Sequence, residues 1–187
     1  MQVTLRNVRQ EDIPLIKPWV VAKENAKWLA PFFQNESMRD EQLALFLMRR
    51  DKVTWLVLCD GVPVGVAGLI NIDTFNRSVE LWLVIGDTRY RGMGLSRISY
   101  ILTLQKAFFE LKLHSVYGWA VEGNYPISSL QKLGFTCGGR QRESHLQDGV
   151  LKDRILIEIL DRELEAGPFA RHTGHIELTK RQEQAGG

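Results

Sequence analysis

Apolar residues recur in short alternating or continuous runs along the first half of the chain, which is the pattern of strands. Strands are expected at residues 3–6, 55–59, 64–70 and 79–85. An Asp60-Gly61 turn between the second and third of them is typical of a hairpin. Helical spacing predicts an amphipathic helix over residues 39–50. Nearer the N-terminus, Asp12 can cap a helix that Pro18 is expected to end or bend.

The second half alternates between helices and strands. Apolar residues at helical spacing predict a long helix over residues 95–111, and a shorter helix over 128–133 stops at Gly134. Strands are expected at 114–121 and 150–160. Hairpins followed by a strand–helix–strand crossover predict a mixed α/β (α+β) sheet covered by helices. The sequence therefore predicts one domain, residues 1–162, and a polar C-terminal tail, residues 163–187.

Composition narrows the functional classes. The 187 residues are 44% hydrophobic and 25% charged, as in an ordinary soluble globular protein. The net charge of +2 gives no general case for nucleic acid or membrane binding. Two cysteines, Cys59 and Cys137, make neither a disulfide framework nor a metal cluster. No metal is therefore expected, and the expected location is the reducing cytoplasm. The charged N-terminus does not look like a signal peptide.

The stretch RYRGMGLS, residues 89–96, carries the most specific chemistry. It lies between a predicted strand and a predicted helix, where exposed backbone N–H groups and the helix dipole favour an anion. Gly92 and Gly94 would let a ligand approach the backbone, and Arg89 and Arg91 supply positive charge. A P-loop would need a lysine here, and a dinucleotide fingerprint would need glycine at Arg97. The alternative is a plain tight connection.

The pattern Arg-x-x-Gly-x-Gly at residues 89–94 resembles the acyl-CoA pyrophosphate loop of the GNAT family of N-acetyltransferases. The strand VELWLVIGD before it, the long helix after it, the strand VYGWAVEGN and the Lys-Leu-Gly-Phe motif at 132–135 follow in that family's order. The closing strand, with Gly149 and Asp153, is similar to the RimJ/RimL-type branch. The resemblance spans about residues 3–160. It implies a GNAT-like acyl-CoA N-acyltransferase fold with a mostly antiparallel central sheet of about six or seven strands.

By this resemblance the co-substrate is acetyl-CoA and the reaction is N-acetylation of a primary amine. The backbone of Trp82, Leu83 and Val84 would line the acetyl group and the pantetheine arm. The pyrophosphate would be held by Arg89, Tyr90, Arg91, Gly92, Met93, Gly94, Leu95 and Ser96. Asn124 would contact the pantetheine arm, and Lys132 of the Lys-Leu-Gly-Phe motif is also placed at the cofactor. For Asn124 the alternative is turn chemistry before Pro126.

Glu80 is the expected general base, because an amine near neutral pH must lose a proton before it attacks a thioester. It matches the glutamate of the family's central strand, and a water could relay the proton. The alternative is a carboxylate paired with an arginine such as Arg77. The expected acids are missing. The family's tyrosine position is Leu130 here, and its serine position is Ile127 or Pro126.

Tyr125, Ser128 and Ser129 are the nearby substitutes for the acid, and Tyr125 is preferred because each serine can instead cap a helix. The thiolate could also leave unaided. The expected partner is an amine such as an amino sugar, polyamine, aminoglycoside or protein N-terminus, with no nucleic acid and no membrane. The chain would be a monomer or a homodimer. The competing hypothesis is a non-catalytic acyl-CoA sensor or scaffold of the same fold.

Overall fold

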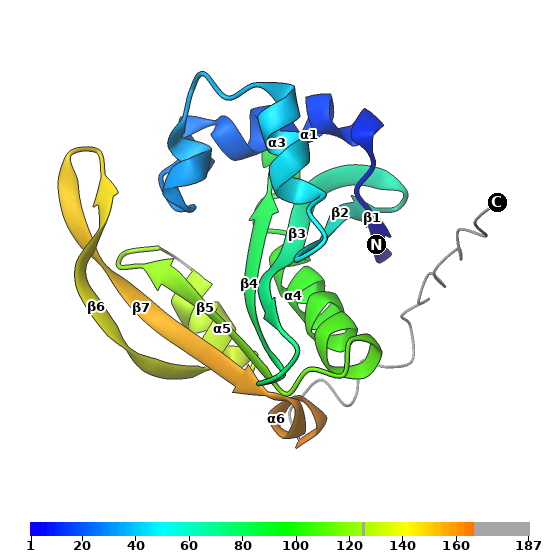
Figure 1. Ribbon diagram of the computed structural model, residues 1–187, viewed down its shortest axis with the longest axis vertical. Helices are drawn as coiled ribbons and strands as arrows, with labels where there is room; N and C mark the ends of the chain where they lie inside the picture. The colour runs from blue at the N-terminus through cyan, green and yellow to red at the C-terminus, as the bar shows by residue number, and fades with distance from the viewer. Residues whose placement is uncertain (125, 167–187) are drawn as a thin grey trace.

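One mixed sheet forms the centre of the molecule (Figure 1), in a computed structural model that describes residues 1–124 and 126–166. Seven strands of this described part pair in the order β1-β2-β3-β4-β5-β7-β6. They are β1 (Val3–Asn7), β2 (Val53–Cys59), β3 (Val62–Asp73), β4 (Ser78–Ile85), β5 (Ser115–Val121), β6 (Thr136–Gln147) and β7 (Val150–Leu160). Neighbours are antiparallel, except that β4 and β5 are parallel. The predicted fold class is confirmed.

Helices cover both faces of the sheet. The first face carries α1 (Ile13–Val21), α2 (Lys23–Ala26), the 3-10 turn η2 (Pro31–Gln34) and α3 (Asp40–Leu47). The second face carries α4 (Leu95–Gln105), its π-helical continuation η4 (Lys106–Glu110), α5 (Pro126–Lys132) and α6 (Asp161–Ala166). Two further 3-10 turns are η1 (Gln10–Asp12) and η3 (Thr88–Tyr90). No helix in these described segments is long and apolar enough to cross a membrane.

The two faces of β4 contribute to two different hydrophobic clusters. Val79, Leu81, Leu83 and Ile85 pack with the α4 side, whereas Trp82 and Val84 pack with α1 and α3. The alternation expected for this strand is therefore confirmed. Its consequence is that Glu80, which shares the parity of Trp82, directs its side chain to the α1–α3 side.

Three elements differ from the sequence-based expectation. The strand β6 was missed because only His145 and Gln147 of its twelve positions are buried, so no apolar alternation marks it. Pro18 does not end α1, because the helix continues to Val21. The last helix, α6, extends past the expected boundary at residue 162 and buries Leu164 in the core. Of the expected tail, residues 167–187 lie outside the described residues.

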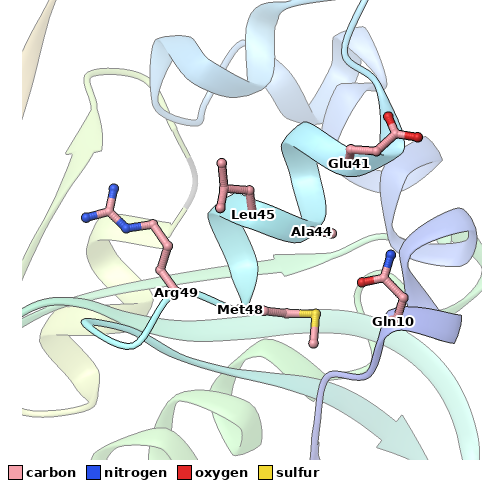
Figure 2. A pocket seen from close by; sticks show the side chains of 6 residues that line it. All are labelled: Gln10, Glu41, Ala44, Leu45, Met48 and Arg49. Carbon is pink, nitrogen blue, oxygen red and sulfur yellow. The ribbon is translucent and has the colours of Figure 1, made fainter.

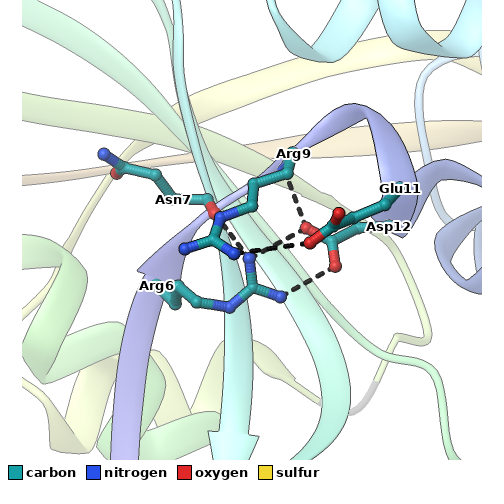
Figure 3. A network of polar contacts seen from close by, with 5 residues as sticks. All are labelled: Arg6, Asn7, Arg9, Glu11 and Asp12. Atoms are coloured by element: carbon teal, nitrogen blue, oxygen red, sulfur yellow. Dashed lines mark hydrogen bonds and ion pairs between the residues drawn. The ribbon is translucent and has the colours of Figure 1, made fainter. Parts of the chain in front are cut away.

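Asp12 does not cap α1 with its side chain (Figure 3). Its two carboxylate oxygens accept hydrogen bonds from the Arg6 guanidinium at 2.7 and 3.0 Å, and one of them also accepts from the Arg9 amide at 2.7 Å. Burial opposes the charged form, but these donors hold the pKa of Asp12 below its ordinary value. The network fastens the end of β1 to the start of α1.

Candidate active site

The central feature is the point at which β4 and β5 separate. Their parallel pairing consists of three register pairs, Ser78 with Ser115, Val79 with Val116 and Glu80 with Tyr117. Both strands then continue, to Ile85 and Val121, and diverge (Figure 1). Within the described residues no register pair joins them beyond Glu80. The sheet is therefore open along the C-terminal part of β4.

Opening the sheet leaves backbone hydrogen-bonding groups without a strand partner. On its other edge β4 remains paired with β3 from Glu80 to Ile85. In a strand, successive N–H and C=O groups point to alternate edges, so some groups of residues 81–85 face the opening. Such groups are costly to bury unpaired, and an extended polar ligand can satisfy them. Trp82, Leu83 and Val84, the expected backbone contacts of the acetyl and pantetheine arm, lie on this edge.

The glycine turn at the end of β4 presents a row of donors. Gly92 and Gly94 have φ angles of 76° and 79°, in the left-handed region that favours glycine, and α4 begins directly after them. In the part of the chain that the structure describes, the amides of residues 92–96 donate to no protein acceptor. These amides and the α4 dipole favour an anion at the helix N-terminus. That this turn holds the pyrophosphate of acetyl-CoA stays a prediction.

The two arginines of the turn are already held by neighbours. Arg89 forms an ion pair with Asp87 at 2.7 Å, and the Asp87 side chain also accepts from the Arg89 amide at 3.0 Å. These hydrogen bonds hold the pKa of Asp87 below its ordinary value. Arg91 donates to the Asn25 side chain at 2.9 Å, which ties the turn to α2. Both arginines are exposed, so each could also reach a bound phosphate, but their present contacts shape the loop.

Glu80 lies where the two strands begin to diverge, and both of its carboxylate oxygens are held. Trp119 Nε1 donates to Oε1 at 3.0 Å, and Asn71 Nδ2 donates to Oε2 at 2.8 Å. The alternative pairing with Arg77 is not present, because the Arg77 guanidinium donates to the Lys112 carbonyl instead. The sequence analysis missed Asn71 and Trp119. Only the register of β3 and β5 against β4 brings them to Glu80, and no motif marks them.

A second layer of polar contacts extends from Trp119 across β7 and β6. The Arg154 guanidinium lies over the Trp119 ring at 4.0 Å from its centroid, and Arg154 Nη2 is 3.5 Å from His145 Nδ1. His145 is only 2% exposed, and its Nε2 donates to the Lys27 carbonyl at 2.8 Å. Because Nε2 carries the proton of that bond, Nδ1 is left to accept. The layer connects the Glu80 region to the chain after α2.

Aromatic side chains form the other wall beside Glu80. Trp82 packs against Phe33, with ring centroids 5.2 Å apart, and Phe46 lies 5.1 Å from Phe33. The ammonium group of Lys52 lies 3.4 Å from the Phe46 ring centroid. A Cβ on Gly68, the β3 residue opposite Trp82, would overlap the indole ring, so glycine is needed there. This wall comes from β4, η2 and α3.

The remaining expected residues lie beyond the end of β5. Asn124 is partly buried, and its amide closes a turn onto the Val121 carbonyl at 2.9 Å. Ser128 and Lys132 are exposed on α5, whereas Leu130, at the family's tyrosine position, is buried in the core. Tyr125 lies outside the described residues. Ser128 shares no hydrogen bond with Glu80, so the structure presents them as separate groups.

A shallow hollow on the surface of α3 lies outside this site (Figure 2). Its volume is about 420 Å³, and its lining side chains come from α3, the residues just after it and η1. The lining residues are Gln10, Glu41, Ala44, Leu45, Met48 and Arg49. None of the expected site residues is among them, so the hollow plays no part in the chemistry considered below.

Comparison with known proteins identifies the family. The family model described as an acetyltransferase (GNAT) domain matches residues 2–136. A search of curated proteins found no significant match.

Solved structures share the fold. A spermidine N-acetyltransferase from Vibrio cholerae, solved in complex with CoA and spermine, superposes with a TM-score of 0.79 at 21% identity, over 87% of this chain and 98% of that one. RimJ from Mycobacterium smegmatis, solved with CoA-disulfide, superposes with a TM-score of 0.73 at 20% identity, over 87% of this chain and 83% of that one. A probable acetyltransferase superposes with a TM-score of 0.74 at 25% identity, over 87% of this chain and 94% of that one. The chain belongs to the GNAT acetyltransferase family and is an acetyl-CoA-dependent N-acetyltransferase.

Proposed function

We propose that this enzyme transfers the acetyl group directly from acetyl-CoA to an amine bound beside Glu80, with Glu80 as the general base. The observation that carries the proposal is the end of β4–β5 pairing at Glu80 itself. A thioester lying along the open edge of β4 would reach that point, while its pyrophosphate would meet the free amides of residues 92–96. The carboxylate and the cofactor are thereby brought to one strand.

The reaction needs a proton acceptor, a donor to the oxyanion and a leaving group. Glu80 accepts a proton from the ammonium form of the acceptor, directly or through a water, so that a neutral amine can attack the thioester carbonyl. A backbone N–H on the open edge of β4 donates to the oxyanion of the tetrahedral intermediate. The C–S bond then breaks as the carbonyl re-forms, the CoA thiolate leaves, and the second proton of the nitrogen passes to the thiolate or to solvent. Trp119 and Asn71 fix the carboxylate and so orient it toward the amine.

Cofactor binding would be shared along β4, the glycine turn and α5. The backbone of Trp82, Leu83 and Val84 would hold the acetyl end, and Asn124 would hold the pantetheine arm. Lys132, exposed near the end of α5, supplies a positive charge for the cofactor. Among the glycine-turn residues, the amides of Gly92 to Ser96 carry most of the pyrophosphate binding, because Arg89 and Arg91 are partly engaged elsewhere.

Protonation of the leaving thiolate is assigned to Ser128 or Tyr125, or to solvent. Leu130 stands where the family has a tyrosine and cannot donate a proton, whereas Ser128 is exposed on the first turns of α5. Comparison of Ser128→Ala with Tyr125→Phe would separate the two candidates. A loss of kcat in only one variant would identify the acid.

The acceptor is a primary amine of a small molecule or of a peptide. The closing strand resembles that of the RimJ/RimL-type branch. There Asp153 accepts hydrogen bonds from the Arg140 side chain and from the Glu143 amide, both at 2.8 Å, and so shapes β6, which we place next to the acceptor. We place the enzyme in the cytoplasm, as a monomer or a homodimer. The missing acid at Leu130 is the one feature that favours the sensor hypothesis, and the oriented carboxylate of Glu80 argues against it, since a scaffold has no use for a positioned base.

The test combines binding and turnover. Isothermal titration with acetyl-CoA is followed by thiol release with a panel of amines, for wild type, Glu80→Gln and the exposed control Glu41→Gln. We expect Glu80→Gln to bind acetyl-CoA normally and to lose about 10²–10⁴-fold in kcat/KM, the usual contribution of a general base. Glu41→Gln should match wild type. Unchanged kcat/KM in Glu80→Gln across the pH range would show that Glu80 is not the base.

A further inference from the structure

Two partly buried cations, Arg154 and Lys52, lie within the electrostatic influence of Glu80, and among the described residues neither forms an ion pair with a carboxylate. Among the arginines that the structure describes, only Arg6 and Arg154 are not exposed. Arg6 is paired with Asp12 at 2.7 Å. Arg154 has no carboxylate within ion-pair distance in the described residues, and its Nε is buried without a hydrogen-bond partner. An arginine withdrawn from water normally has an anion to bind.

The surroundings of Arg154 contain no other anion in the described residues. From β5 it meets the Trp119 ring, and from β6 it meets the imidazole of His145. From β4, the charge of Glu80 acts on it through space. Burial lowers the pKa of Arg154, and the Glu80 charge only partly offsets that effect. Glu80 itself is already bonded to Trp119 and Asn71, so the guanidinium retains an unused donor.

Lys52 repeats the arrangement on the opposite wall. Its ammonium lies over the Phe46 ring at 3.4 Å, and its neighbour Asp51 is bonded through both oxygens to Arg49, at 2.9 and 3.0 Å. Burial lowers the pKa of Lys52, while the charges of Asp51 and Glu80 oppose that shift. Each cation thus lies on an aromatic ring and within electrostatic reach of the same carboxylate. Glu80, Arg154 and Lys52 together carry one negative and two positive charges, so the region around Glu80, where the amine would bind, has an excess positive charge.

We propose that the acceptor is a small amine that also carries an anionic group, a carboxylate or a phosphate, that Arg154 binds this group while Glu80 receives the ammonium, and that Lys52 adds positive charge from the opposite wall. The inference rests on the proposed function, because it uses Glu80 as the amine's proton acceptor. A zwitterionic or amino-phosphate ligand matches the three charges in sign. The Arg154 guanidinium, with a donor unused, suits the paired oxygens of either anion. A polycation would meet two like charges here.

The test measures preference within pairs of amines that differ in the anionic group. Phenylalanine is compared with phenylalaninamide for the carboxylate, glucosamine 6-phosphate with glucosamine for the phosphate, and spermidine represents a polycation. Wild type is expected to favour the anionic member of at least one pair by about 10-fold or more in kcat/KM, and the pair that responds identifies the anion. The loss of a charge-assisted hydrogen bond in Arg154→Met should reduce that preference about 10- to 100-fold.

Lys52→Met should reduce the same preference and provides the test if Arg154→Met does not fold. Arg162→Gln removes an exposed arginine on α6 and should keep the wild-type preference. Equal or better turnover of the neutral members and spermidine would overturn the inference, as would a preference that survives both Met variants. If no amine of the panel reacts while acetyl-CoA still raises the Tm, the inference is also wrong, because it requires a small anionic amine. A fully active Glu80→Gln would instead contradict the proposed base.

Discussion

Replacing Gly94 with alanine tests whether the glycine turn holds the pyrophosphate. Gly94 has φ of 79° and precedes α4. A Cβ built there meets no atom within 4 Å, so the added methyl group has space in the free protein. Two penalties remain. An L-residue with a side chain is strained at this φ, and the methyl group would project from backbone that a ligand must approach closely.

The strain is worth about 1–2 kcal/mol for a residue other than glycine. If the turn keeps its shape without ligand, this cost lowers the Tm by about 2–4 °C per kcal/mol, as for other domains of this size. If the empty turn relaxes, the cost appears when acetyl-CoA binds and raises the Kd about 5- to 30-fold. In either case the methyl group would also contact the phosphates directly, so a higher Kd is expected whether or not the empty turn relaxes.

Gly61 supplies a matched control. Its φ is 80°, a Cβ there also meets nothing within 4 Å, and it lies in the β2–β3 turn. The assay is isothermal titration of acetyl-CoA into both alanine variants, with the Tm of each measured without ligand. We expect Gly61→Ala to lower the Tm and leave the Kd unchanged, whereas Gly94→Ala raises the Kd. A wild-type Kd for Gly94→Ala would refute the assignment of this turn to the pyrophosphate.

Three further substitutions test other contacts. Trp119→Phe keeps an aromatic ring but removes the hydrogen-bond donor 3.0 Å from Glu80, so kcat should fall about 10-fold while the acetyl-CoA Kd, measured by titration, stays unchanged. An unchanged kcat would mean that this hydrogen bond does not position the carboxylate. Gly68→Ala should lower the free energy of unfolding by about 1–3 kcal/mol in urea, since its methyl group overlaps Trp82, and full stability would contradict the packing described. Because the pKa of Asp12 is lowered in the folded state, its charge stabilises the fold at pH values above the carboxyl's ordinary pKa, and this stability is lost as the pH falls toward the lowered value. Asp12→Asn should therefore lower the free energy of unfolding by about 2 kcal/mol near pH 7 and flatten the acid side of the stability–pH curve. An unchanged slope would show that Asp12 is not its source.

The strands and helices that carry a regular apolar pattern could be predicted from the sequence. The alternation in β4 identified both of its faces, and the spacing after Gly94 identified α4. The apolar pattern does not identify an element whose side chains are mostly exposed to water. The strand β6 is held by pairing with β7 rather than by a buried face, so its polar residues and two glycines look like a loop.

The candidate site divides in the same way. The glycine turn and Glu80 could be found because each lies within a local motif. Their partners could not, because Trp119 and Asn71 reach Glu80 only through the strand register, and Arg154 reaches Trp119 only through the pairing of β5 with β7. The expected acid is still a prediction, since Tyr125 lies outside the described residues.

The short seam between β4 and β5 has a consequence for how this enzyme can be stabilised. Three register pairs make up the whole strand pairing between the β1–β4 half of the sheet and the β5–β7–β6 half in the described residues. Extending that pairing would satisfy more backbone groups and make a more continuous sheet, but it would close the edge that we propose for acetyl-CoA. Selection for stability alone would therefore work against catalysis at this seam, and a thermostable variant must gain its stability elsewhere.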